Sequence, residues 1–222
     1  VVIEVMATVE INHKKTKTIS RFGQSTVHFT VQLDDGNKLT DLASHGGVDC
    51  AILNGGIERW VEEARPMTST ASPNPKPGSF AVDSSWLRGH AGLEDVQAAV
   101  DSPTACLVDA LSVDSFDGTR GGYGPLKGHI TSAINVPMSE FVTGNTARFR
   151  GADEIEALLH DSSLLDAPKV ITYCGGAIAA TVDAFALALF GHPDVSVYDG
   201  SLMEWTANPD LPMTDPNPSE AP

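Results

Sequence analysis

The sequence predicts an α/β fold with a parallel sheet that has helices on both of its faces. Short apolar runs with the character of strands alternate with segments of helical periodicity, an order typical of parallel α/β sheets. Residues 50–67 and 195–213 also share one pattern: an apolar run ends at Asn-Gly or Asp-Gly, and a helical segment with a tryptophan and a later Pro-Met follows. This repeat indicates an internal duplication within the 222 residues.

The carboxyl-terminal part of the chain contains a full set of such elements. Ala105–Leu111 is the first expected strand, and the glycine-rich segment Gly118–Gly124 is expected to form a loop. Gly128–Pro137 follows, and then the apolar strand Lys169–Tyr173. Ile178–Gly191 is expected to be a helix that ends at its glycine.

One side of this last helix is apolar. Ile178, Val182, Phe185 and Leu189 recur at spacings of four, three and four residues. Such spacing places side chains on one face of a helix. We therefore expect these four side chains to be buried against the sheet.

The amino-terminal part holds fewer elements. We expect strands at Val1–Val5 and Thr26–Val31 and a helix at Lys38–Gly47, ahead of the first copy of the repeat. A piece of this size buries little apolar surface, so it is expected to depend on the rest of the chain for its stability.

Composition predicts the domain boundaries. Residues 68–79 are rich in Pro, Ser and Thr, which is typical of an extended linker. We therefore expect a shortened domain at 1–67, the linker at 68–79, a complete domain at 80–213 and a tail at 214–222.

The charge of the chain disfavours several classes of partner. The formal net charge is −15, and residues 151–222 carry 12 acidic side chains and a single basic one, Lys169. Such a surface repels phosphate backbones and anionic lipids, so neither nucleic-acid binding nor membrane binding is expected. The most apolar long stretch, Ala177–Phe190, is interrupted by Asp183 and is too short to span a bilayer.

Cysteine usage predicts a cytoplasmic protein with reduced thiols. The three cysteines are far apart and form no CxxC pair, and the first residues lack the pattern of a signal peptide. This spacing argues against a disulfide framework and a zinc site. Cys50 and Cys106 lie inside apolar runs, and we expect both in the core.

Cys174 has a different setting, directly after the apolar strand that ends at Tyr173. The sequence Gly-Gly-Ala-Ile-Ala-Ala follows it and leads into a helix. In an open parallel sheet, ligands bind at the carboxyl ends of the strands. Small residues there let successive N–H groups point inward, beside the positive end of the next helix. Such a cradle stabilises a negatively charged sulfur, which makes Cys174 the candidate nucleophile.

These residues resemble the catalytic domain of tandem-domain rhodanese-type sulfurtransferases over residues 80–213. The similarity is carried by LVDAL at 107–111, GHITSAINVP at 128–137, YCGGAIAAT at 173–181 and GHPDVSVYDGSLMEW at 191–205. Residues 24–67 resemble, more weakly, the second half of the inactive partner domain, through LNGGIERW and RPM. No Cys lies between Thr26 and Leu42, where an active loop would fall, so the resemblance implies a non-catalytic amino-terminal domain.

The resemblance implies a sulfurtransferase. Cys174 takes a sulfane sulfur from a small-molecule donor of the thiosulfate or 3-mercaptopyruvate type, and the persulfide passes it to cyanide or a thiol. No metal or organic cofactor is implied. The backbone amides of the next residues would cradle the persulfide. These residues are Gly175, Gly176, Ala177, Ile178, Ala179 and Ala180.

Further residues are candidates for supporting roles. Asp109 and His129 match family positions, and we expect them to order the strand end and the nearby loop by hydrogen bonds. Arg120 and Lys127 are candidates for substrate recognition. Tyr123, on the glycine-rich rim, is a less favoured candidate for contact with substrate.

Several positions depart from the family's pattern. The loop after Cys174 has no basic side chain that could grip an anionic donor. Leu111 and Ser115 stand where arginines are usual. Ala177 stands where a third glycine is usual, and an alanine costs about 1 kcal/mol if the backbone there is left-handed. From these departures we expect thiosulfate to be a poor donor.

Two alternatives differ in their chemistry. Cys-dependent phosphatases and arsenate reductases need an Arg about six residues after the Cys to bind an oxyanion. Ala180 and Thr181 occupy those positions, which disfavours that class. A sulfur carrier or interaction module of the same fold, without turnover of small molecules, stays open, and so does the oligomeric state.

Overall fold

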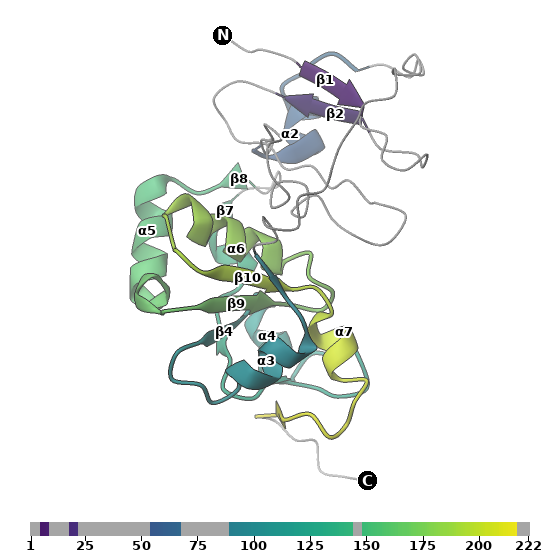
Figure 1. The fold of residues 1–222 in the computed structure, drawn as a ribbon. Helices are drawn as coiled ribbons and strands as arrows, with labels where there is room; N and C mark the ends of the chain where they lie inside the picture. The colour runs from purple at the N-terminus through teal and green to yellow at the C-terminus, as the bar shows by residue number, and fades with distance from the viewer. Residues whose placement is uncertain (1–4, 9–17, 22–53, 68–88, 144–147, 217–222) are drawn as a thin grey trace. The chain divides into compact units, whose positions relative to one another are not determined.

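The computed structural model describes residues 5–8, 18–21, 54–67, 89–143 and 148–216 (Figure 1). The chain divides into two compact units. The first unit comprises residues 1–88 and 143–149, and the second comprises residues 89–142 and 150–222.

A parallel sheet forms the centre of the second unit. Among the described residues it has five strands in the order β3-β10-β9-β4-β6, and every neighbouring pair is parallel. The strands are β3 (His90–Ala91), β4 (Cys106–Asp109), β6 (Ile134–Asn135), β9 (Val170–Tyr173) and β10 (Val195–Tyr198).

Helices lie on both sides of these strands. Figure 1 shows α5 and α6 on one side and α3 and α7 on the other. The helices of this unit are α3 (Leu93–Ala99), α4 (Val113–Phe116), α5 (Ala152–Asp161), α6 (Ala180–Leu189) and α7 (Ser201–Trp205). The predicted α/β class with a parallel sheet is confirmed.

Short elements complete the described structure. Residues 128–137, expected as one segment, contain two two-residue strands, β5 (His129–Ile130) and β6. The remaining pieces are β7 (Val142–Thr143), β8 (Arg148–Phe149), β11 (Met213–Thr214), which pairs antiparallel with β5, and the 3₁₀ turns η2 (Met138–Glu140) and η3 (Leu164–Asp166).

The core lies around the central strands. All four residues of β9 are buried, which explains why this strand reads as a continuous apolar run. Leu107, Ile171 and Trp205 are at most 1% exposed and belong to the same apolar cluster. The expected strands at 105–111 and 169–173 are therefore present, in slightly shorter form.

The predicted buried face of α6 is wrong. Ile178 lies in the loop before the helix and is 78% exposed, and Leu189 is 52% exposed. The buried face consists of Ala180, Asp183, Ala186 and Leu187. The helix is apolar on most sides, so periodicity did not identify the inner face, and the small alanines let it pack closely on the sheet.

The first unit contains a different set of elements. β1 (Val5–Thr8) pairs antiparallel with β2 (Thr18–Arg21), an arrangement the repeat did not predict. The predicted opening strand overlaps β1 only at Val5, and the elements expected at 26–31 and 38–47 lie outside the described residues.

The first copy of the repeat is described from its turn onward. α2 (Gly56–Glu62) buries Trp60, whose Nε1–H donates to the Pro66 carbonyl at 2.9 Å. The second copy has the same contact, because Trp205 Nε1–H donates to the Pro212 carbonyl at 3.3 Å. Within the described residues, no helix has the length and apolar character needed to cross a membrane.

Candidate active site

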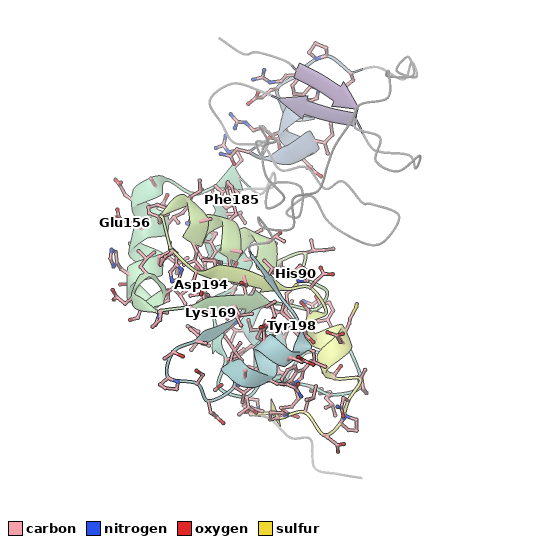
Figure 2. The ribbon with its side chains drawn as sticks, in the orientation of Figure 1. His90, Glu156, Lys169, Phe185, Asp194 and Tyr198 are labelled. Atoms are coloured by element: carbon pink, nitrogen blue, oxygen red, sulfur yellow. The ribbon has the colours of Figure 1, made fainter. Side chains whose placement is uncertain are left out.

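Cys174 lies directly after β9, between its neighbours β10 and β4 in the sheet. Figure 2 shows Lys169 and Asp194 where β9 and β10 begin, with Tyr198 toward the opposite end of β10. Cys174 therefore sits at the carboxyl edge of the sheet, the edge at which open parallel sheets bind ligands. The residue is 3% exposed.

Ser201 anchors the loop that follows Cys174. Its Oγ accepts the N–H of Cys174 at 3.2 Å and the N–H of Ala177 at 3.0 Å. The Ser201 hydroxyl in turn donates to the Tyr198 carbonyl at 2.8 Å. One buried hydroxyl thus fixes both ends of the first loop turn to the end of β10.

The first turn of α7 holds the same loop through its backbone. The N–H of Leu202 donates to the Cys174 carbonyl, and the N–H of Met203 donates to the Gly175 carbonyl, both at 3.0 Å. The loop and the start of α7 therefore form one hydrogen-bonded unit.

Two residues of this unit have a left-handed backbone. Ala177 has φ 60° and Ser201 has φ 49°, a region that costs a non-glycine residue about 1–2 kcal/mol. The Ala177–Ser201 hydrogen bond joins them, so the surrounding contacts hold the strained conformation. The backbone at Ala177 is thus left-handed, which is the condition under which the sequence predicted a cost of about 1 kcal/mol for an alanine here.

The loop offers backbone donors to a ligand. Among the described residues, the N–H groups of Gly175, Ile178 and Ala179 make no hydrogen bond with the protein. They precede the first turn of α6, where a helix carries partial positive charge. An anionic group bound beside Cys174 would meet this positive potential.

Two side chains pack against the glycines of the loop. A Cβ on Gly175 would overlap the ring of Tyr123, and a Cβ on Gly176 would lie 3.4 Å from Met203 Sδ. Tyr123 is 45% exposed and Met203 is 59% exposed. The rim residue Tyr123, the less favoured candidate, therefore lies directly on the cysteine loop.

Asp109 and His129 make the ordering contacts that the sequence predicted. Asp109, at the end of β4, accepts the Leu111 N–H on Oδ1 at 2.9 Å. His129 Nδ1 donates to the Phe116 carbonyl at 2.8 Å, and its ring stacks on that of Phe116. Burial raises the pKa of Asp109 to about 6, opposed by the Leu111 N–H and the nearby Tyr173 hydroxyl.

A second buried carboxyl lies on α6. Asp183 is fully buried, and neither of its oxygens has a hydrogen-bond partner among the described residues. Burial, and then the negative charge of Asp109, raise the pKa of Asp183 well above its usual value. The same two causes raise the pKa of Tyr173.

The candidate basic residues Arg120 and Lys127 make no described contact with the cysteine loop. Arg120 and Lys127 are exposed, and neither side chain makes a hydrogen bond or ion pair within the described part of the chain. Leu111 and Ser115, at positions where arginines were expected from the resemblance, are both 7% exposed. The loop itself, residues 174–180, offers only backbone groups to an anion.

The other cysteines do not enter the site. Cys106 is half-buried in β4, so the expectation of a core position holds only in part, and burial raises the pKa of its thiol. Cys50 lies outside the described residues. Across residues 54–67, 89–143 and 148–216, no group of three His, Cys, Asp or Glu side chains gathers in a way that could hold a metal ion.

Sequence reasoning missed three residues at or near the site. Ser201 and Met203 lie inside a quoted motif but were given no role, and Asp183 was treated only as an interruption of an apolar stretch. The alignment of the repeat contained one usable signal, because Ser201 corresponds to Gly56, which has no hydroxyl.

Comparison with known proteins agrees with this geometry. Residues 92–208 match the model of the rhodanese-like domain. The chain is 32% identical over 161 residues to 3-mercaptopyruvate sulfurtransferase of Rattus norvegicus, covering 70% of this chain and 52% of that protein. It is 32% identical over 162 residues to thiosulfate sulfurtransferase of Gallus gallus, covering 72% and 54%.

A solved structure shows the same fold. The anaerobic ergothioneine biosynthesis enzyme from Chlorobium limicola superposes with a TM-score of 0.69 at 24% identity, over 79% of this chain and 44% of that one. The chain spans about half the length of the curated relatives it matches.

Proposed function

Because the chain belongs to the family of rhodanese-like domains, we propose that it is a sulfurtransferase in which Cys174 carries the transferred sulfur. The position of this residue carries the proposal. Its N–H and that of Ala177 are fixed by Ser201, while the N–H groups of Gly175, Ile178 and Ala179 stay open to a ligand in the described structure.

The reaction would proceed in two half-reactions. The Cys174 thiolate attacks the outer sulfur of a donor such as thiosulfate, the S–S bond of the donor breaks, and its electron pair leaves with sulfite. Cyanide or a thiolate then attacks the outer sulfur of the Cys174 persulfide. The second S–S bond breaks, and the Cys174 thiolate is regenerated.

Each group of the site has a role in this scheme. The open N–H groups and the start of α6 stabilise the negative charge on the persulfide. Ser201 and the first turn of α7 hold the loop in the required shape. Asp109 orders the end of β4, and His129 orders the loop that carries Tyr123.

We assign the first 67 residues to a non-catalytic partner domain. In support, α2 and Trp60 repeat the turn and helix of the second unit, but Gly56 stands in the place of Ser201 and has no hydroxyl to anchor a loop. Residues 26–42 contain no Cys. The relatives named above act as sulfurtransferases according to their names, and either donor class fits the proposal.

Intact-protein mass spectrometry tests the function. After treatment with thiosulfate or 3-mercaptopyruvate, we expect a mass increase of one sulfur atom at Cys174, lost again when cyanide is added with release of thiocyanate. Cys174→Ser removes both signals because a hydroxyl oxygen cannot carry a sulfane sulfur. Cys106→Ser, the matched control, keeps them.

The outcomes separate the two candidate functions. Thiocyanate production by the Cys174→Ser variant would contradict the proposed mechanism. Addition of sulfur to Cys174 without transfer to cyanide or small thiols would instead favour the sulfur-carrier alternative. The absence of basic side chains from residues 174–180 is the observation that supports this alternative.

A further inference from the structure

The mouth of the candidate site is apolar. Tyr123 packs on Gly175, Met203 packs on Gly176, and Ile178 lies in the same loop with 78% of its surface exposed. These three exposed side chains, which we call the apolar rim, lie on or against the loop that begins at Cys174, a residue that is itself 3% exposed.

The charged residues beside the rim on the α7 side are acidic. Glu204, next to Met203, accepts the Tyr198 hydroxyl at 2.7 Å, and Asp199 precedes the turn into α7. The loop from Cys174 to Ala180 contains no charged side chain. Within this loop, only backbone dipoles attract the negative charge of a donor, and a second charge on the donor adds repulsion from Glu204 and Asp199.

Exposed apolar side chains beside a reacting atom favour a substrate with apolar surface of its own. Placing an aromatic ring against Tyr123 and the Met203 thioether removes apolar area from water and adds ring–ring and sulfur–ring contacts. A small inorganic anion gains none of these contacts.

We propose that the apolar rim selects an organic sulfane-sulfur donor, one that bears an aromatic or apolar group beside the sulfur and at most one negative charge. This inference rests on the proposed function and names its donor class. For a thiosulfonate donor, the Cys174 thiolate attacks the terminal sulfur, the S–S bond breaks, and its electron pair leaves with the organic sulfinate.

Turnover of three donors distinguishes the effect of charge from the effect of apolar contact. Thiosulfate, methanethiosulfonate and benzenethiosulfonate carry the same terminal sulfur on a sulfonyl group. The first has two negative charges, the second has one charge and a methyl group, and the third has one charge and a ring. We expect kcat/KM to rise along this series, with a gain of about tenfold from methyl to phenyl.

Variants of the rim test which residues are responsible. Met203→Gln and Tyr123→Gln are each expected to lower kcat/KM for benzenethiosulfonate by about tenfold, the value of one aromatic contact. Both should lower methanethiosulfonate turnover by a smaller factor, because its methyl group buries less apolar surface than a phenyl ring. A mass increase of one sulfur atom at Cys174 in each variant shows that the cysteine and its loop are intact. Leu189→Gln, a matched change of an exposed residue at the far end of α6, should affect neither donor.

The experiment distinguishes failure of this inference from failure of the proposed function. Equal use of the methyl and phenyl donors, or thiosulfate as the best donor, would overturn selection by the rim while leaving sulfur transfer intact. Unchanged phenyl preference in both rim variants would do the same. If none of the three donors adds sulfur to Cys174 but 3-mercaptopyruvate does, the inference fails and the proposed function stands. If 3-mercaptopyruvate also adds none, the proposed function fails, and the inference fails with it.

Discussion

Residues 54–67 and 199–213 repeat one turn and helix, and they differ at the residue that starts the helix. In both copies a tryptophan N–H donates to the carbonyl of a proline that follows the helix. Gly56 and Ser201 occupy equivalent positions and both have a left-handed backbone, with φ 60° and 49°. The backbone at these two positions is therefore alike, although the preceding glycines differ, with φ 93° at Gly55 and −61° at Gly200. The side chains at the two positions are different.

The hydroxyl of Ser201, which Gly56 lacks, has a large consequence for the cysteine loop. In the second copy the hydroxyl of Ser201 accepts two N–H groups of the cysteine loop. A glycine at the equivalent position can accept none. The comparison teaches that a shared scaffold supports either a structural turn or a loop anchor, depending on one hydroxyl group.

The largest expected effect comes from removing this anchor. Ser201→Ala leaves the buried N–H groups of Cys174 and Ala177 without their acceptor, which should lower the free energy of unfolding by about 4 kcal/mol. We also expect sulfur transfer to fall at least tenfold, in line with the loss of a positioning contact. Chemical denaturation and steady-state kinetics provide the two measurements.

Ser196→Ala is the control for this variant. Ser196 is a buried serine of β10, and its hydroxyl makes no hydrogen bond with the described loop residues 174–180. Its replacement should change stability by less than about 1 kcal/mol. Equal effects of the two substitutions would show that Ser201 is not a special anchor.

The second prediction concerns buried carboxyl groups, which the two units do not share. Asp109 and Asp183 are buried in the second unit, whereas the described residues of the first unit include no buried carboxyl. The pKa of Asp109 is about 6 in the folded protein, against an ordinary value of 3.8. The folded state therefore binds this proton more tightly than the unfolded state does.

The sign of the pH dependence follows. The stabilisation of the folded state by the Asp109 proton is fully present below the pKa of this group in the unfolded chain. It is lost as the pH rises through about 6. Between these limits it amounts to about 3 kcal/mol. Asp109→Asn should remove this component, so its free energy of unfolding relative to the parent should improve between pH 4 and pH 7. Denaturant titrations at several pH values provide the measurement.

An exposed carboxyl serves as the control for the pH experiment. Asp153→Asn, on the exposed side of α5, should leave the pH profile of the parent unchanged. A profile of Asp109→Asn parallel to that of the parent would show that Asp109 does not titrate in this range.

The smallest expected effect comes from replacing a left-handed alanine with glycine in each unit. Ala64 follows α2 with φ 50°, and Ala177 lies in the cysteine loop with φ 60°. Replacing either with glycine should stabilise its own unit by about 1 kcal/mol, because glycine adopts this backbone without steric cost. Hydrogen exchange measured within each unit detects the gain.

Activity distinguishes the two alanine variants. Ala64→Gly should leave sulfur transfer unchanged, whereas Ala177→Gly acts on the loop itself and should alter its rate. Destabilisation of either variant would mean that the alanine methyl group makes contacts worth more than the backbone strain.

Part of the site was predictable from the sequence. The apolar run before Tyr173 predicts a buried central strand, and the small residues after Cys174 predict a tight loop ahead of a helix. Local pattern suffices here because strand burial and loop shape depend on neighbouring residues. For Ala177, the glycine that related loops carry there predicted a cost only if the backbone were left-handed, and the structure shows that it is.

Other features depend on residues that meet only in the folded chain. Ser201 lies 27 residues after Cys174, and Tyr123 reaches Gly175 from a separate loop. Because α6 is apolar on most sides, its sequence did not predict which face is buried. In the folded protein, the face with the small residues and Asp183 packs against the sheet. The sequence by itself determined the strand, the position of Cys174 at its end and the tight loop that follows, because these features depend on local composition. Tertiary structure decided the anchor, the apolar rim and the buried carboxyls, because packing brings distant segments together.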